Sequence, residues 1–166
     1  MSNEKNSYES LAEEFLRRIL DGMGVSAHIE IRRRKENLVL SIEGCSEPGR
    51  IIGKEGNTLH QIQFLVNLMI MKKLKSRMNV MVDVEGYRER RRQNLLSRAQ
   101  NAVKKVKDKG KPVLLEPMHA ADRRIVHLAL RDDLLIETTS VNEDRETGMK
   151  SVRISLRRRT PPPSSD

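Results

Sequence analysis

The stretch that decides the predicted fold of this chain is Arg50-Ile51-Ile52-Gly53-Lys54-Glu55-Gly56-Asn57. Its two glycines permit backbone angles and close approach that a Cβ atom would block. The amphipathic segment that follows is predicted to be a helix, whose N-terminus presents unpaired N–H groups and a partial positive charge. A glycine loop in that position is a place where a phosphodiester backbone can lie against the protein. We therefore take this stretch as the first candidate binding site.

The side chains of this loop have different expected roles. We expect Arg50 and Lys54 to supply positive charge. We expect Ile51 and Ile52 to line an apolar groove for bases. Glu55 is discordant because a carboxylate repels phosphate, so it either weakens the site or points away from the ligand. Since two glycines this close together are common by chance, the alternative interpretation is an ordinary turn between two helices.

Hydrophobic periodicity on both sides of the loop predicts the elements of the first half of the chain. Their order is helix, strand, strand, short helix, loop, helix and strand, at 8–20, 28–32, 38–42, 51–52, 53–56, 57–75 and 79–84. A charged hairpin turn is expected at 33–37, and Asn57 or Thr58 is expected to cap the second long helix. The buried face of that helix is predicted to comprise Leu59, Ile62, Val66, Met69 and Leu74. This order is typical of the type II KH topology.

The second half of the chain is predicted to form a separate unit. Its long helix, 88–108, has an apolar face made of Leu95, Ala99, Ala102 and Val106. Strands are expected at 113–115, 134–140 and 150–156, with a polar turn at 142–148. The intervening helix, 118–130, is predicted to bury Met118, Ala121, Ile125 and Leu128. The tail at 159–166 is expected to be disordered.

The second candidate site lies on this shorter helix. Arg123 and His127 are four residues apart and therefore share a helix face, with Arg124 and Arg131 beside them. Such a patch suits contacts to phosphate and bases. The alternatives are a solvated helix face or a histidine that is hydrogen-bonded as a structural pin.

Charge and composition limit the possible partners. The chain has 32 Lys and Arg against 23 Asp and Glu, a net charge of +9 and a pI of about 10.0. Residues 1–84 carry 13 basic and 11 acidic side chains, and residues 85–166 carry 19 and 12, so the excess lies in the second half. This favours polyanions, chiefly nucleic acid, with an anionic membrane as the lesser possibility. Because aromatic residues make up only 2% of the chain, modules that stack bases on several rings are disfavoured.

Several absences in the sequence narrow its class further. Cys45 is the single cysteine, so no intramolecular disulfide is possible. The polar N-terminus lacks the apolar core of a secretory signal, and no apolar run approaches the roughly 18 residues that cross a bilayer. We find no paired acids, no nucleophile with a base and no metal-ligand spacing. The sequence thus predicts a cytoplasmic, non-catalytic protein without cofactor, metal or stable membrane insertion.

From Tyr8 to Leu156 the chain resembles the Jag family, also called KhpB or EloR, in which a KH domain precedes an R-3-H domain. The motifs that carry the resemblance are Gly53-Lys54-Glu55-Gly56, Asp122-Arg123-Arg124-Ile125-Val126-His127-Leu128 and Glu116-Pro117-Met118. The resemblance implies RNA binding, a link to cell elongation and division, and pairing with a small stand-alone KH protein. Compared with larger members, we expect the chain to lack their extra N-terminal domain and linker, and it differs in carrying Glu55 and in its turn at 142–150.

We therefore predict an α+β protein with a type II KH domain at 8–84 and an R-3-H domain at 86–158, the latter a three-stranded sheet packed on two helices. It is expected to grip about four nucleotides of single-stranded RNA in the KH loop. The residues expected to bind nucleic acid are Arg50, Ile51, Ile52, Gly53, Lys54, Glu55, Gly56, Asn57, Arg123, Arg124 and His127. Two alternatives stay open: single-stranded DNA as the ligand, and a scaffold protein whose KH faces pair with themselves or another KH domain.

Overall fold

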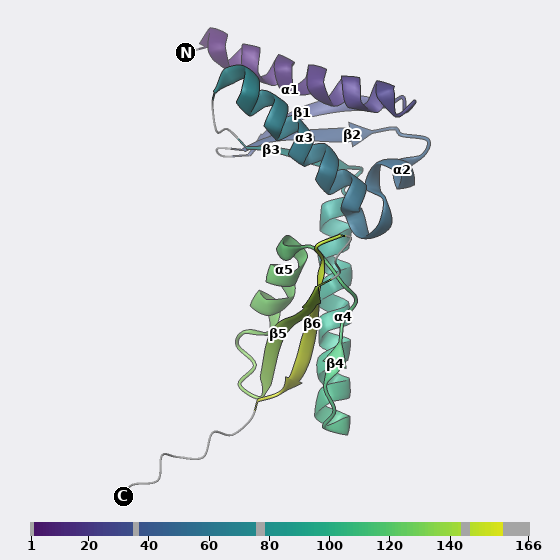
Figure 1. Ribbon diagram of the computed structural model, residues 1–166, viewed down its shortest axis with the longest axis vertical. Helices are drawn as coiled ribbons and strands as arrows, with labels where there is room; N and C mark the ends of the chain where they lie inside the picture. The colour runs from purple at the N-terminus through teal and green to yellow at the C-terminus, as the bar shows by residue number, and fades with distance from the viewer. Residues whose placement is uncertain (1, 35–36, 76–78, 144–146, 158–166) are drawn as a thin grey trace, which may run out of the picture. The chain divides into compact units, whose positions relative to one another are not determined.

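The computed structural model describes residues 2–34, 37–75, 79–143 and 147–157 of the chain (Figure 1). The chain divides into two compact units, Met1–Glu89 and Arg90–Asp166. Each unit contains a three-stranded sheet with helices, so the predicted α+β class is confirmed. Residues 35–36 of the predicted hairpin turn, residues 144–146 of the predicted polar turn and the tail at 159–166 lie outside the described residues.

The first unit follows the predicted order of elements. These are α1 (Ser2–Gly22), β1 (His28–Arg34), β2 (Asn37–Glu43), α2 (Pro48–Ile52), the 3-10 turn η1 (Lys54–Gly56), α3 (Asn57–Leu74) and β3 (Val80–Val84). The central strand β2 pairs antiparallel with β1 and parallel with β3. This order confirms the KH topology predicted from the periodicity.

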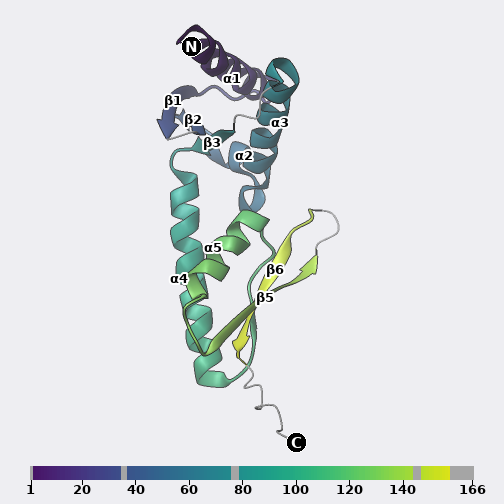
Figure 2. The ribbon, with the colours of Figure 1, turned by 90° about the vertical axis from the view of Figure 1, so that its left-hand side faces the viewer.

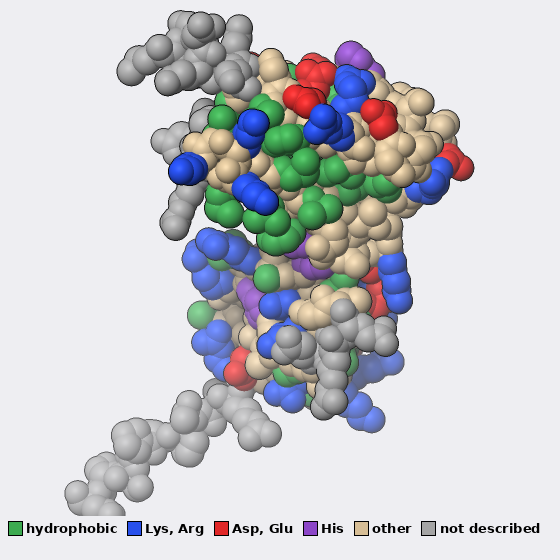
Figure 3. Space-filling view, turned by 45° about the horizontal axis from the view of Figure 1, so that its top comes forward, with side chains coloured by type: hydrophobic (Ala, Val, Ile, Leu, Met, Phe, Trp, Pro, Cys, Tyr) green, Lys and Arg blue, Asp and Glu red, His purple; other side chains and the backbone are tan. Residues whose placement is uncertain are grey.

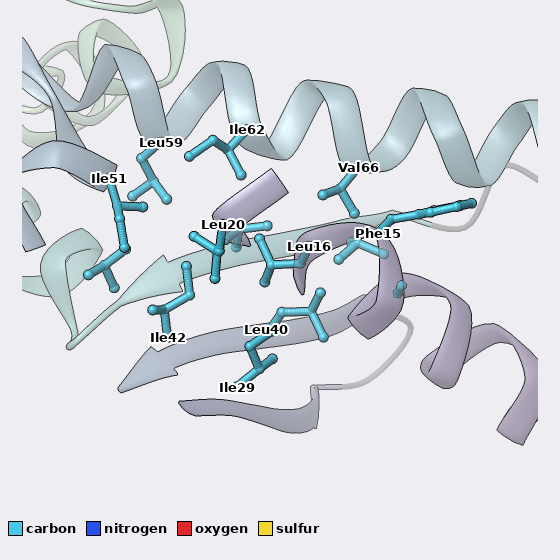
Figure 4. Close-up of a cluster of buried hydrophobic side chains, with 14 of the residues drawn as sticks. Phe15, Leu16, Leu20, Ile29, Leu40, Ile42, Ile51, Leu59, Ile62 and Val66 are labelled. Atoms are coloured by element: carbon cyan, nitrogen blue, oxygen red, sulfur yellow. The ribbon is translucent and has the colours of Figure 1, made fainter. Parts of the chain in front are cut away.

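The core of the first unit lies between its sheet and two long helices, α1 and α3. Figure 4 shows side chains from both helices pointing toward those of β1 and β2; the labelled residues are Phe15, Leu16, Leu20, Ile29, Leu40, Ile42, Ile51, Leu59, Ile62 and Val66. One prediction for α3 was wrong, because Leu74 is exposed and Ile70 is fully buried instead. The backbone of Val80, where β3 begins, pairs with Asn67. The last turn of α3 therefore extends beyond the start of the sheet.

The backbone N–H and C=O groups on the outer edge of β3 form hydrogen bonds with side chains and not with another strand. The Asn67 amide donates to the Val80 carbonyl and accepts from the Val80 N–H, each at 2.8 Å. Gln63 Oε1 accepts from the Val82 N–H at 3.1 Å, and Arg88 Nε donates to the Val82 carbonyl at 2.8 Å. An edge strand with occupied backbone groups cannot template the addition of a further strand.

The second unit places its helices on one side of its sheet (Figure 2). Its elements are α4 (Tyr87–Lys109), which begins within the first unit, β4 (Val113–Leu114), α5 (Ala120–Leu130), β5 (Ile136–Glu143) and β6 (Lys150–Leu156). Strand β6 is central and pairs antiparallel with both β4 and β5. The predicted apolar face of α4 is confirmed, since Leu95, Ala99, Ala102 and Val106 are all buried.

The buried face of α5 differs from the prediction. Of the predicted residues, Met118 is buried and Ile125 is partly buried against the same core. However, Ala121 is exposed and half of the Leu128 surface is accessible, while Val126 and Leu130 are buried instead. The rows 121/125/128 and 122/126/130 are both compatible with a helical repeat. The second row faces the core, with Val126 and Leu130 in the cluster and Asp122 paired with Arg91 of α4. Within the described ranges, no helix is both long and apolar enough to cross a membrane.

Candidate nucleic-acid interface

The two glycines of the loop are required by the fold of the loop itself. Gly53 has φ 70° and ψ −177°, a combination that only glycine adopts readily. A Cβ atom there would lie 2.1 Å from Thr58 Oγ1. Gly56, at φ 80°, is buried, and its Cβ would lie 2.9 Å from Tyr87 Oη. The fold itself therefore requires both glycines, because neighbouring atoms occupy the space where a Cβ atom would lie; their expected role in the approach of a ligand stays a prediction.

The loop leads directly into α3, and the N-cap residue of this helix makes no side-chain cap. Glu55 adopts a left-handed conformation, φ 53° and ψ 24°, and Gly56 follows in the same region as the N-cap residue. The predicted capping by Asn57 or Thr58 is wrong, because Asn57 already has helical angles and the N-cap residue is Gly56, which has no side chain. An 18-residue helix therefore begins with an uncapped first turn, and the exposed Lys54 lies just before it. Such a helix terminus attracts anions.

The side chains before the loop make more contacts within the protein than predicted. The Arg50 guanidinium donates to Glu47 Oε2 and to the carbonyl of Met23, both at 2.8 Å, and so ties α2 to the segment after α1. Ile51 is fully buried in the core, so its predicted place in a groove for bases is wrong. Ile52 is half-buried and packs against the same core. The apolar spacing that suggested a groove reflects burial of the short helix.

In the second unit, His127 joins α5 to β5. Its Nδ1 lies 2.7 Å from Thr138 Oγ1 and its Nε2 lies 3.0 Å from Ser140 Oγ. Neither hydroxyl was predicted from the sequence, although their spacing of two along a strand places them on one face. The structure thus gives His127 the hydrogen-bonded structural role left open above. Burial, and secondly the charge of Arg123, lower the pKa of His127.

The two arginines of this motif differ in their surroundings. Arg123 is half-buried and its Nη1 donates to the carbonyl of Met118 at 3.0 Å. Arg124 is exposed, and within the described residues its side chain makes no hydrogen bond or ion pair. The largely buried ion pair between Arg91 Nε and Asp122 Oδ2, 3.1 Å long, anchors the start of α5. Removing one partner of such a pair typically costs about 3–5 kcal/mol.

Comparisons with known proteins assign a class to each unit. Residues 9–83 match the family model described as the KhpA/KhpB KH domain, and residues 93–151 match the model of the R-3-H domain. Together with the two sheets, these matches define a protein with a KH domain followed by an R-3-H domain.

Relatives named RNA-binding protein KhpB are similar along most of the chain. The protein from Clostridium symbiosum is 36% identical over 159 residues, which are 95% of this chain and 70% of that protein. The protein from Lactiplantibacillus plantarum is 28% identical over 145 residues, 87% of this chain and 44% of that protein. The protein from Bacillus subtilis is 28% identical over 116 residues, 70% of this chain and 55% of that protein. The chain belongs to the KhpB family, as its motifs predicted.

The packing of Gly56 against Tyr87 can be tested against a glycine without a neighbour. Gly56 and Gly44 have φ values of 80° and 64°, but only a Cβ at Gly56 would meet another residue within 4 Å. Both Gly→Ala changes incur the cost of a left-handed residue. We expect Gly56→Ala to lower the free energy of unfolding by about 1–3 kcal/mol more than Gly44→Ala, the usual cost of overpacking. Urea denaturation measures the difference, and equal losses would contradict the constraint.

The environment of His127 predicts a distinctive titration. Its pKa should lie below the ordinary value, and Arg123→Gln should raise it only in part, because burial is the larger cause. As pH falls through the unfolded-state pKa of about 6.5, the unfolded chain binds a proton that the folded ring resists, so this residue lowers stability at acidic pH. NMR titration of the imidazole measures the pKa, with Arg131→Gln as the matched control. An ordinary pKa in the unmodified chain would contradict the account.

Proposed function

We propose that this chain binds single-stranded RNA without catalysing a reaction. The observation that carries the proposal is the uncapped N-terminus of α3, entered through the loop Gly53–Gly56, with the exposed Lys54 beside it. A phosphodiester backbone matches both the partial charge of the helix and the lysine. The net charge of +9 and the printed name of the KhpB relatives support the same ligand.

The other proposed contacts to RNA are assigned from the solvent exposure of the residues. In the first unit, Gly53, Lys54 and Asn57 are at least partly accessible and would hold the backbone, with Glu55 directed away from phosphate. In the second unit, Arg124 is exposed and would extend the contact, while Arg123 and His127 shape the helix–sheet edge beside it. The units act as a KH domain at 8–84 and an R-3-H domain at 86–158. The setting proposed is the bacterial cytoplasm, in post-transcriptional control of elongation and division.

A charge change in the loop tests the proposal. Lys54→Asp combined with Glu55→Asp should weaken the affinity for a short fluorescent oligouridine about tenfold or more, because a cation becomes an anion at the helix terminus. The matched control is Lys72→Asp, the same charge change near the other end of α3. If roughly 5 phosphates are neutralised, log K should fall with log salt at a slope of about −3.5.

Fluorescence anisotropy gives both affinities and the salt slope, and thermal melting verifies that each variant is folded. Equal affinity of the loop variant and the Lys72→Asp control would remove the loop from the binding site. Competition by DNA of the same base sequence distinguishes RNA from the single-stranded DNA alternative.

A second candidate function, pairing with another KH domain, is favoured by the outer face of α3. Its side chains Phe64, Leu65, Leu68 and Met71 are 56%, 44%, 41% and 47% exposed. Phe64, Leu68 and Met71 recur at helical spacing, on the side opposite the buried Ile62, Val66 and Ile70. Hydrophobic side chains gather on this face of the first unit (Figure 3). A helix that is apolar on both sides is normally covered.

Disruption of that face tests the second candidate. Leu68→Lys should convert a dimer into a monomer, because a buried lysine without a partner opposes association. Met81→Lys is the matched control: Met81 is an exposed apolar side chain on the face of the sheet opposite the core, and its change should leave the dimer intact. Light scattering without RNA measures the mass, and a monomeric unmodified chain at high concentration would contradict self-pairing.

A further inference from the structure

The second sheet has an open face that the R-3-H motif does not use. Along β5 and β6 the buried Ile136, Val152 and Ile154 point toward α4 and α5. Because side chains alternate along a strand, Glu137 and Arg153 point to the other side of the sheet. Figure 2 shows that side uncovered by the helices. His127 contacts the helix-facing side, so the two faces carry separate sets of polar groups.

A hollow of about 510 Å³ lies at one end of this open face. Its lining residues are Gly110, Pro112, Glu137, Arg153, Ser155 and Leu156. The register pairs Ser155 with Glu137, and Val113 with Ile154, so Pro112 lies alongside Ser155 on the opposite flank. A volume in this range suits a small ligand of the size of a nucleoside. Pro112 and Leu156 supply apolar contact, and the other side chains supply polar groups.

The polar groups of the hollow are available to a ligand. In the described part of the chain, neither Arg153 nor Glu137 makes a side-chain hydrogen bond or an ion pair. Both are exposed, and Arg153 pairs with Thr139, two residues along β5 from Glu137. The site therefore offers a planar cation and a carboxylate acceptor on adjacent rows of one surface. The exposed Lys109 and Lys111 flank Gly110 at its rim.

We propose that this hollow holds one unstacked guanine of a single-stranded RNA. The inference rests on the proposed RNA binding and adds a base preference to it. The Arg153 guanidinium stacks on the plane of the base, as arginine does in single-stranded RNA recognition. The Glu137 carboxylate accepts hydrogen bonds from N1–H and the N2 amino group. Lys111 or Lys109 neutralises the adjoining phosphate.

Guanine is selected because of the order of donors on its Watson–Crick edge. An ionised carboxylate only accepts hydrogen bonds. Guanine presents two adjacent donors, N1–H and the N2 amino group. Adenine and cytosine each place an acceptor nitrogen beside their amino group, and uracil flanks its single N–H with two carbonyl oxygens, so each brings an acceptor against the carboxylate.

A titration of the full chain with GMP, AMP, CMP and UMP tests the site by NMR. GMP should shift the backbone amides of Gly110, Glu137 and Ser155 at concentrations where the other nucleotides do not. Glu137→Gln should weaken GMP binding roughly tenfold, because a carboxamide cannot accept both hydrogen bonds and a good bidentate contact is worth about that factor or more. Glu14→Gln, at an exposed acid of the first unit, is the matched control and should bind GMP as the unmodified chain does.

The proposal is overturned if GMP shifts none of these amides, or if Glu137→Gln binds GMP as tightly as the control. A second experiment separates this inference from RNA binding itself, by comparing oligouridine with and without one central guanosine. The unmodified chain should prefer the guanosine-containing RNA and Glu137→Gln should not. Equal affinity of the unmodified chain for both RNAs overturns the guanine site alone, whereas failure to bind either RNA overturns the proposed function and this inference with it.

Discussion

The structure of the first unit depends on the left-handed turn formed by Gly53, Glu55 and Gly56 and packed against Thr58 and Tyr87. All three residues have positive φ values, and at both glycines a side chain would meet a neighbour closer than 3 Å. The turn ends α2 and determines the residue at which α3 begins. Because the N-cap residue that it provides has no side chain, the constraint that shapes the loop also leaves the N-terminus of α3 open for the anion contact that we propose.

The position at which α3 begins also determines what each of its faces contacts. Ile62, Val66 and Ile70 face the core, while Gln63 and Asn67 reach the backbone of β3. A shift of one residue would rotate the helix by about 100°, burying the amides and leaving the β3 edge unpaired. The side chains that hydrogen-bond this edge exclude β3 as a site of strand addition, and we propose the apolar outer side of α3 as the surface for a partner instead.

Much of the fold could be predicted from the sequence because its periodicity is strong. The element order of the KH unit and the buried face of α4, from Leu95 to Val106, follow from spacing alone. The orientation of α5 could not be predicted, since residues 121/125/128 and 122/126/130 form overlapping rows. The choice between them depends on packing between distant segments, which includes the Arg91–Asp122 ion pair. Leu74 was placed in the core for a similar reason, because periodicity does not reveal where the sheet ends.

The candidate sites were harder to predict than the elements that carry them. Motif spacing located the loop and His127, but not their local partners. The burial of Ile51, the bonds of Arg50 to Glu47 and Met23, and the contact of Gly56 with Tyr87 all depend on tertiary packing. Likewise, the hydroxyls of Thr138 and Ser140 meet His127 only after β5 has packed on α5.

The most direct test of the central claim is an NMR titration of backbone amides with single-stranded RNA. The claim is that the uncapped first turn of α3 holds a phosphate presented to it by the left-handed loop. The account predicts that the largest shifts of the first unit occur at the amides of Gly53 to Leu59, and that they diminish as salt is added. If the chemical shifts of these amides stay unchanged when RNA is fully bound, the account is contradicted.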